Sequence, residues 1–403
     1  MPNLDRLKRL SDEVAIVGIG DTDYATDYVR SKEFAQRKRA DPTIAPGHDA
    51  YTFATRALKR ALDDCGLDVS DIDGLVVGPT LSIERTGEVL GIESSWSSQA
   101  DAVNAIVEAA SAIHAGLAEC VALVYGNDQR SNEKQYGGPT AEGARFRAYV
   151  NYAPWGMTSQ GGFYAMMTQR YMALHNVSEA DLARISVAQR KFAQLNDNAI
   201  MRQPLAVADY LSARYICEPL RLPDYCLVND GGVALILTTA ERAKRMRQSP
   251  VLITGISRSD MNRDATSLRP RLIDFYHTAH RSAAQQAYEM AGFGPSDIGM
   301  LQVYDSFSPH VLFALEGFGF CPIGEGARFI ANGKIEPGGS LPVNTSGGHL
   351  SESYMQGWNH QVESVRQLRG HAGKRQVENL RRAQYISDVA GKVASVIYTR
   401  GSK

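Results

Sequence analysis

One segment in the second half of the chain combines residue types that suit an active-site loop. Residues 344–357 read NTSGGHLSESYMQG, with small residues and two glycines before a histidine, serines and a tyrosine. Gly347 and Gly348 permit a tight backbone, and we predict a helix over Trp358–Gln367. Amides exposed beside a helix N-terminus can hold an anion or an enolate oxygen. Tyr354 stands five residues after the histidine, where its phenol is either a catalytic group or part of the packing.

A second candidate stretch follows a predicted buried strand. Residues 303–307 read VYDSF. Ligands of open α/β sheets gather at the carboxyl ends of strands, so Tyr304 and Asp305 are placed where chemistry tends to occur. Asp305 is equally compatible with a cap at the strand end. The chain has 18 tyrosines, so packing is the ordinary role for any single one of them.

Composition excludes several classes of function. The chain has 403 residues, with 43 Lys and Arg against 44 Asp and Glu, and a formal net charge of −1. A nearly neutral chain without a long basic run argues against nucleic acid as the main partner. No apolar run reaches the ~20 residues of a membrane span, and the opening MPNLDRLKRLSDE lacks the apolar core of a signal peptide. We therefore expect a cytoplasmic protein.

Neither the cysteines nor the histidines suggest a metal site or a disulfide framework. The cysteines are few, odd in number and scattered, which suits a reducing compartment. We predict no metal site on this chain, and we interpret three histidines of the second half as structural or surface groups. These histidines are His277, His280 and His310, and the cysteines are Cys65, Cys120, Cys217, Cys226 and Cys321.

Hydrophobic periodicity predicts alternating helices and strands, which is the pattern of an α/β protein. The predicted helices are Ala54–Asp64 and Ala102–Leu117, and the predicted strands are Val14–Gly18, Leu75–Gly78, Val121–Tyr125, Val233–Leu237 and Val393–Tyr398. We expect the last strand at an edge or in a hairpin with Tyr385–Val389.

The second half repeats a unit of the first. ATRALKRALDDCGLDVSDIDGLVVG, which begins at Ala54, aligns with HRSAAQQAYEMAGFGPSDIGMLQVY, which begins 226 positions later at His280. The shared unit is a helix, a glycine stop (Gly66 and Gly292), an S-D-I turn and a buried strand. Two unrelated helices would not easily share the glycine, the turn and the strand in one register, so we infer an internal duplication.

The duplication divides the chain into two halves and an insertion. The predicted divisions are an N-terminal half at 1–150 and 208–245, a helical insertion at 151–207, and a C-terminal half at 246–403. The insertion contains a helical run, Ser178–Met201, which opens with a hydroxyl cap and an acid three residues later. Such an insertion covers a site or forms a dimer surface, or it is a purely structural layer.

Taken together, these features resemble the thiolase superfamily, and most closely its sterol-carrier-protein-x branch. The resemblance covers nearly the whole chain and rests on the duplicated halves and three motifs. The motifs are NDGGVALIL at 229–237, YDSF with LEGFGFCPIGEG at 304–326, and NTSGGHLSESY at 344–354. It implies a thiolase fold, which is a duplicated α/β architecture of five α-β-α-β-α layers in a homodimer that handles acyl-coenzyme A thioesters.

The departures from the family pattern indicate which chemistry is lost. Thiolases carry a nucleophilic cysteine at the start of a buried helix, and the matching region here, Ser94–Ala100, contains no cysteine. The late Cys-Gly loop of the family has no counterpart around Ile397–Arg400. Tyr304 replaces a family histidine, whereas Gly347-Gly348-His349 keeps the family Gly-Gly-His. The covalent acyl-enzyme step has therefore lost its nucleophile.

This pattern resembles a narrower group, the thiolase-like aldolases that remove side chains in bacterial steroid degradation. The resemblance implies that Tyr304 and Tyr354 form a catalytic pair for retro-aldol cleavage of a steroid β-hydroxyacyl-coenzyme A. A side chain hydroxylated at ring carbon 17 would give a 17-keto steroid and propionyl-coenzyme A. Bile-acid, sterol or other bulky alicyclic acyl groups fit the sequence equally well.

The reaction needs a base for the hydroxyl proton, an oxyanion site for the enolate, and an acid for the enolate carbon. A phenol has an ordinary pKa of ~10 but can relay a proton when hydrogen bonds assist it. We assign Tyr354 as the base and Tyr304 as the acid, and the two roles can be exchanged. Candidates for orienting the phenols are Asp305, His349 and Ser351, and candidates for holding the thioester oxygen are Ser346, Gly347 and Gly348. Without a cysteine nucleophile, His349 is also compatible with a leftover loop residue.

The resemblance also implies a partner and leaves two alternative functions. Steroid aldolases of this kind work with a small protein that combines an OB-fold with a zinc-ribbon-like segment. We therefore expect a homodimer flanked by two such partners, with any zinc in the partner and no cofactor on this chain beyond the coenzyme A of the substrate. The alternatives are a thiolase-like acyltransferase with a relocated nucleophile and a non-enzymatic carrier of lipid or acyl-coenzyme A.

Overall fold

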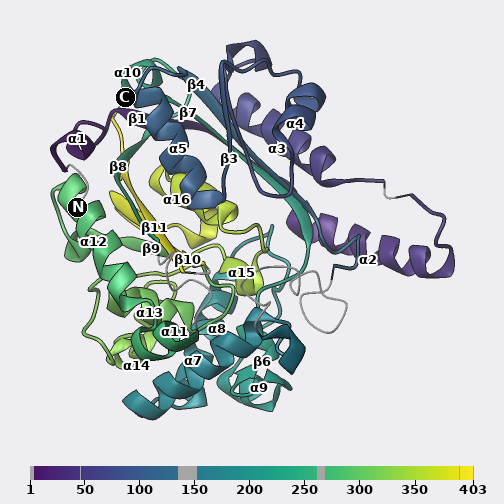
Figure 1. Ribbon diagram of the computed structural model, residues 1–403, viewed down its shortest axis with the longest axis vertical. Coiled ribbons are helices and arrows are strands. Elements are labelled where there is room, and N and C mark those ends of the chain that lie inside the picture. The colour runs from purple at the N-terminus through teal and green to yellow at the C-terminus, as the bar shows by residue number, and fades with distance from the viewer. Residues whose placement is uncertain (1–3, 46, 135–151, 261–267, 390, 403) are drawn as a thin grey trace.

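One mixed sheet of nine strands organises the chain (Figure 1). The computed structural model describes residues 4–45, 47–134, 152–260, 268–389 and 391–402. Within these residues the strand order is β3-β2-β4-β7-β1-β8-β11-β10-β9, and a separate hairpin joins β5 to β6. The strands are β1 (Val14–Asp21), β2 (Gly74–Val77), β3 (Trp96–Gln99), β4 (Cys120–Asp128), β5 (Tyr215–Cys217), β6 (Leu220–Arg221), β7 (Asp230–Thr239), β8 (Val251–Asp260), β9 (Met300–Val303), β10 (Arg382–Val389) and β11 (Lys392–Arg400).

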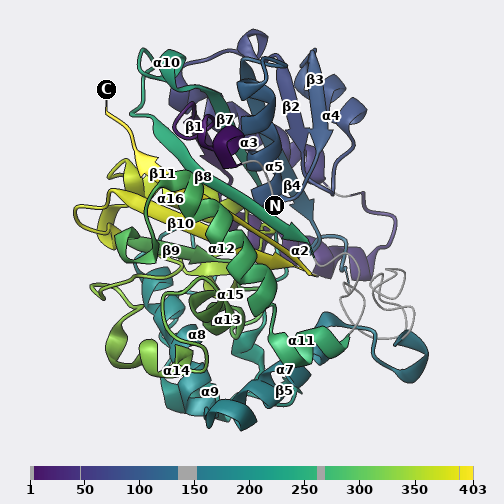
Figure 2. The ribbon, with the colours of Figure 1, turned by 60° about the vertical axis from the view of Figure 1, so that its left-hand side comes forward.

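Helices lie on the outer face of each half of the sheet, and further helices lie between the two halves (Figures 1 and 2). The helices are α1 (Leu4–Lys8), α2 (Tyr24–Ala40), α3 (Ala50–Cys65), α4 (Ile83–Leu90), α5 (Ala102–His114), α7 (Gln160–His175), α8 (Glu179–Gln194), α9 (Val207–Ser212), α10 (Ala240–Ala243), α11 (Leu268–Asp274), α12 (His277–Ala291), α13 (His310–Gly317), α14 (Gly326–Phe329), α15 (Gly348–Ser351) and α16 (Trp358–Leu368). Helices α3 and α4 pack on the first half of the sheet, and α12 and α13 pack on the second. Helices α5 and α16 contact strands of both halves. The predicted five-layer α/β thiolase fold is confirmed.

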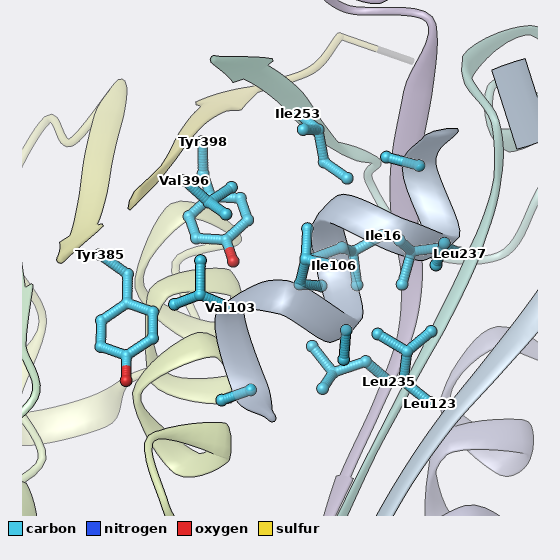
Figure 3. Close-up of a cluster of buried hydrophobic side chains, with 14 of the residues drawn as sticks. Ile16, Val103, Ile106, Leu123, Leu235, Leu237, Ile253, Tyr385, Val396 and Tyr398 are labelled. Carbon is cyan, nitrogen blue, oxygen red and sulfur yellow. The ribbon is translucent and has the colours of Figure 1, made fainter. Parts of the chain in front are cut away.

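The central layer lies in the largest core cluster (Figure 3). Val103 and Ile106 of α5 point between two groups of apolar side chains, one from each half of the sheet. The labelled residues of the first half are Ile16, Leu123, Leu235 and Leu237, and those of the second half are Ile253, Tyr385, Val396 and Tyr398. All of these side chains are buried, so the two halves share one interior.

The internal duplication is confirmed in both local structure and sheet order. Helix α3, a one-turn 3-10 helix at Val69–Asp71 and β2 match α12, a 3-10 helix at Pro295–Asp297 and β9, with Gly66 and Gly292 both left-handed at the helix ends. The order β2-β4-β7-β1 is mirrored by β9-β10-β11-β8, with one parallel and two antiparallel pairings in each set of four strands. The halves join where β1 pairs with β8.

The insertion contains two long helices, and one of them is shorter than predicted. Helix α8 ends at Gln194, whereas the predicted run extended to Met201. The Asn196 side chain accepts the backbone N–H of Asn198, a local turn that competes with helical hydrogen bonding. The predicted start is confirmed, because Ser178 and Asp181 form a capping box. Helix α7 precedes this start and was not predicted.

Two further expectations are settled at the first sheet edge and at the C-terminus. Ser94–Ala100, the region matched to the family cysteine, contains β3, and α5 begins at the predicted Ala102, after the N-cap Asp101. Strand β11 forms the expected hairpin with β10 and lies inside the sheet rather than at its edge. Within the described residues, no helix combines the length and the apolar character that a bilayer crossing requires.

Candidate active site

Two phenols meet in the interior of the second half. The hydroxyl oxygens of Tyr304 and Tyr354 lie 2.8 Å apart, with the rings nearly perpendicular. Tyr304 is 5% exposed, and Tyr354 is partly buried. Tyr304 directly follows β9, and its backbone N–H continues the sheet by donating to the carbonyl of Ile386 at 2.9 Å. Tyr354 lies in the loop between α15 and α16, so two segments 50 residues apart bring one hydroxyl of each to a common point.

The loop that carries Tyr354 is held by residues of the first half. The backbone N–H of Tyr354 donates to Asn229 Oδ1 at 2.7 Å, and the Asn127 side-chain amide donates to the Tyr354 carbonyl at 3.4 Å. Asn127 lies near the end of β4, and Asn229 directly precedes β7. From the sequence, residues 229–232 (NDGG) were interpreted only as a turn before a strand, so the role of Asn229 in holding the Tyr354 loop was missed. The only local signal was an amide side chain beside a Gly-rich turn.

Burial fixes the resting protonation of the inner phenol. Loss of water raises the pKa of Tyr304 well above its ordinary value, and the neighbouring Tyr354 raises it further. A phenol in this position keeps its proton at neutral pH and donates it only when the acceptor is strongly basic. Tyr304 therefore suits the role of an acid better than that of a base.

Asp305 is the hub that links the two motifs. Its carboxylate accepts the backbone N–H groups of His349 at 3.0 Å and Leu350 at 3.4 Å, at the N-terminal end of α15. It also receives His360 Nε2 at 3.0 Å. Burial acts to raise the pKa of Asp305, but the hydrogen bonds from the His349 backbone N–H and from His360 outweigh burial and hold the pKa below its ordinary value. The carboxylate is thus ionised and ties the VYDSF segment to the Gly-Gly-His turn.

His349 lies between the phenols as a neutral ring. Its ring centre is 4.9 Å from that of Tyr304 and 5.0 Å from that of Tyr354, edge to face with both. His349 Nε2 accepts the backbone N–H of Gly357 at 2.9 Å, which occupies the lone pair that a second proton would need. Burial lowers the pKa of His349 to about 3, and nearby His360 contributes to this shift. The ring can orient both phenols by contact and anchor the far end of their loop.

The remaining candidates for support lie deeper than the phenols. Ser351 Oγ accepts Arg190 Nε at 3.0 Å, which fastens α15 to α8. The Ser346 hydroxyl donates to Glu352 at 2.7 Å, and the Gly347 amide donates to the Asn344 carbonyl at 2.9 Å, closing the turn. The structure thus places Ser346, Gly347, Gly348 and Ser351 in a buried scaffold beside the phenol loop. An oxyanion role for the amides of this turn stays a prediction.

Asp305, His349 and His360 also have the composition of a metal site, with possible ligand atoms within 4.8 Å of one another. Their hydrogen bonds fit a different arrangement. His360 Nε2 contacts Asp305 directly at 3.0 Å, and its other nitrogen faces Gln302 Oε1 at 2.9 Å. His349 Nε2 is occupied by a backbone N–H. A metal ion requires free nitrogen lone pairs, so these three residues fit a hydrogen-bonded cluster rather than a set of ligands.

A second buried cluster adjoins Tyr304. Asp388, at the end of β10, receives His280 Nε2 at 3.1 Å and also His310 Nδ1, and His310 Nε2 lies 3.2 Å from Ser306 Oγ. Burial acts to raise the pKa of Asp388, but the two histidines outweigh it and lower the pKa. His310 packs edge to face on Tyr304 with ring centres 6.1 Å apart. His280, His310 and His277 are all buried, so of the two predicted roles, structural or surface groups, burial leaves the structural one.

Comparison with known proteins places this chain in a family. The chain is 33% identical over 380 residues to the steroid side-chain-cleaving aldolase of Thermomonospora curvata, covering 90% of this chain and 91% of that protein. It is also 33% identical over 377 residues to the 17-hydroxy-3-oxo-4-pregnene-20-carboxyl-CoA lyase of Mycobacterium tuberculosis, covering 90% and 92%. The solved Ltp2-ChsH2(DUF35) aldolase superposes with a TM-score of 0.86 at 32% identity, covering 98% of this chain and 99% of that one.

More distant matches agree on the fold. Residues 265–398 match the family described as thiolase C-terminal domain-like. Human mitochondrial 3-ketoacyl-CoA thiolase superposes with a TM-score of 0.68 at 13% identity, covering 97% of this chain and 98% of that one. The fold therefore defines a thiolase-superfamily protein, and a hydrogen-bonded pair of phenols lies in the interior of its second half. Within that superfamily, the chain belongs to the steroid side-chain-cleaving aldolases of the sterol-carrier-protein-x-like branch.

Proposed function

We propose that this protein is a carbon–carbon lyase that cleaves the side chain of a steroid β-hydroxyacyl-coenzyme A by a retro-aldol reaction. The observation that supports this proposal most directly is the 2.8 Å contact between the Tyr304 and Tyr354 hydroxyls. Relatives of similar length, matched over most of the chain, are named for the same reaction class. The reaction needs no redox cofactor, so we propose that the chain has none of its own.

The phenol pair can move the protons of this reaction without a free phenolate. For a 17-hydroxy steroid with a 20-carboxyl-coenzyme A, Tyr354 receives the C17 hydroxyl proton as the C17–C20 bond breaks. The bonding electrons move into the thioester enolate, and C17 becomes a ketone. Tyr354 passes its own proton to Tyr304, and Tyr304 protonates C20 to give propionyl-coenzyme A. The raised pKa of Tyr304 supports this direction, because that phenol begins protonated.

The direct test is incubation with a synthetic 17-hydroxy-steroid 20-carboxyl-coenzyme A, followed by chromatography of the products. Equal amounts of 17-keto steroid and propionyl-coenzyme A are expected. Unchanged substrate that binds tightly, with the partner protein present, would instead support a carrier of acyl-coenzyme A. Substrates with longer or differently hydroxylated side chains, assayed in parallel, would define the steroid class.

We further propose that the chain is a homodimer that works with a small DUF35-type partner. The supporting observation is that the solved aldolase similar over nearly its whole length is a complex of Ltp2 with ChsH2(DUF35). We expect any zinc to be held in that partner. We also expect a cytoplasmic location, because the proposed substrate is a coenzyme A thioester and all five cysteines are free thiols. Co-purification of dimer and partner, followed by light scattering, tests the assembly.

One observation favours a second candidate, a thioester acyltransferase with a relocated nucleophile. Ser306, His310 and Asp388 stand in the order hydroxyl, imidazole and carboxylate that activates a serine. Ser306 Oγ would attack the thioester carbonyl, its proton would pass to His310 Nε2, and that proton would leave with the coenzyme A thiol. Mass spectrometry of the protein after incubation with an acyl-coenzyme A decides the matter. An acyl group on Ser306 that is absent from Ser306→Ala supports this candidate and counts against the lyase.

A further inference from the structure

His360 lies beneath the phenol loop and is fully buried. It is the third residue of α16, and its ring centre is 4.4 Å from that of His349 and 5.4 Å from that of Tyr385. Both ring nitrogens have hydrogen-bond partners: Nδ1 faces Gln302 Oε1 at 2.9 Å, and Nε2 faces Asp305 Oδ1 at 3.0 Å. Which nitrogens carry protons follows from what those two partners can donate or accept.

The orientation of Gln302 is fixed by a chain of bonds that starts at a buried salt bridge. Arg375 donates to both oxygens of Glu363, at 3.1 and 2.9 Å, and this cation lowers the pKa of Glu363 against the effect of burial. An ionised carboxylate only accepts, so the Thr345 hydroxyl donates to Glu363 at 2.9 Å. The single Thr345 proton is then used, and its oxygen accepts the Gln302 amide N–H at 3.1 Å. The Gln302 carbonyl oxygen must therefore face His360.

Both nitrogens of His360 therefore face acceptors. Nδ1 faces an amide oxygen, and Nε2 faces the carboxylate of Asp305, whose pKa is lowered and which already accepts two backbone N–H groups. A neutral imidazole carries one N–H and would leave one of these short contacts as two facing lone pairs. The ring fits its surroundings only with a proton on each nitrogen. The resulting cation and the Asp305 anion neutralise each other beside a neutral His349.

We infer that His360 is a buried imidazolium that acts through Asp305 as a positioning residue for the Tyr304–Tyr354 pair. The cation keeps Asp305 ionised, and Asp305 holds the first turn of α15 by the amides of His349 and Leu350. His349 in turn holds the amide of Gly357. Tyr354 lies between these two anchors, so its hydroxyl position relative to Tyr304 depends on the pair. The positioning role rests on the proposed lyase function, whereas the charge of His360 does not.

Nuclear magnetic resonance of protein labelled with ¹⁵N-histidine tests the charge without any substrate. In the folded protein at neutral pH, we expect both nitrogens of His360 to show directly bonded protons, because both face acceptors. The signals are assigned by their loss in His360→Gln. A His360 spectrum with one unprotonated nitrogen at this pH would overturn the inference, whether or not the protein proves to be a lyase.

Steady-state kinetics of the chain in complex with its partner protein tests whether His360 positions the Tyr304–Tyr354 pair. His360→Gln is expected to lower kcat by about 100-fold, the scale of a catalytic group misplaced by ~1 Å, with KM changed far less. His277→Gln, which removes another buried histidine beside a carboxylate, 3.4 Å from Glu316, is the matched control and is expected to keep kcat within about 3-fold. The double variant Asp305→Asn/His360→Gln leaves no unpaired charge and is expected to fold at least as stably as Asp305→Asn alone. Full turnover by folded His360→Gln would overturn the positioning role.

Discussion

Tyr354→Phe is the sharpest test of the phenol pair, because it removes one oxygen and keeps the ring. The lost hydroxyl lies 2.8 Å from that of Tyr304, which is 5% exposed. If the Tyr354 phenol accepts the substrate proton, turnover should fall by ~100-fold or more. This loss corresponds to ~2.7 kcal/mol of barrier, at ~1.36 kcal/mol for each factor of ten. The orphaned Tyr304 hydroxyl should also lower the free energy of unfolding by ~1–3 kcal/mol.

The assay is initial-rate cleavage of the steroid thioester by the complex with its partner, with urea denaturation of the same variants in parallel. Tyr398→Phe is the matched control, since Tyr398 is also fully buried and its hydroxyl donates to Gln361 at 2.9 Å. It should lose similar stability and keep its turnover. The comparison therefore separates the removal of a buried hydroxyl from the removal of a reacting one.

The double variant shows whether the two phenols act as a unit. Residues that serve one proton-transfer step are strongly non-additive. We therefore expect the turnover of Tyr304→Phe/Tyr354→Phe to equal that of the slower single variant within about 3-fold. Near-normal turnover by folded Tyr354→Phe would refute the relay, and independent, multiplying losses would refute the coupling between the phenols.

Three further changes test the scaffold. Asn229→Ala removes the acceptor of the Tyr354 amide, so kcat should fall by about 10- to 100-fold in the cleavage assay; unchanged kcat would mean that the loop is held without it. The pKa of His349 in the folded state is lowered to about 3. As the pH falls, His349 is therefore protonated in the unfolded chain before it is protonated in the folded one. Stability should therefore fall by ~1.4 kcal/mol per pH unit from pH ~6.5 toward pH ~3. His349→Gln keeps an acceptor for the loop amide and should lack this share of the slope in urea titrations. A Cβ at Gly232 would stand 2.2 Å from a carbonyl oxygen of α3, so Gly232→Ala should cost ~1–3 kcal/mol in thermal unfolding. Gly294→Ala, where no atom lies within 4 Å of the new Cβ, is the control and should be nearly neutral.

The repeated unit was predictable because every part of it is local. A helix with one apolar face, a glycine stop, a short turn and a buried strand all leave patterns within about 25 residues, and both copies fold as predicted. The mirrored strand order was not predictable. It depends on pairing between strands far apart in the chain, such as β1 with β8, and periodicity within a strand carries no information about its neighbour.

The site divides in the same way. Tyr304 and Tyr354 were identified by motif, and Asp305 was placed correctly at the end of a strand. The roles of Asn229 and His360 were not predicted. Each hydrogen-bonds to a residue at least 55 positions away in the chain, and neither belongs to a motif that indicates catalysis. Ser351 was proposed to orient the phenols, but its hydroxyl bonds to Arg190 instead.

The sequence by itself determined which groups are available: two phenols at motif positions, a Gly-Gly-His turn, and no cysteine at the start of the central helix. Only the tertiary structure decided how these groups behave. It brought the phenol oxygens to 2.8 Å, left His349 neutral and gave His360 two acceptors. Protonation and proton transfer depend on water exclusion and on partners within about 3 Å. Both are set by segments that meet only after the chain has folded.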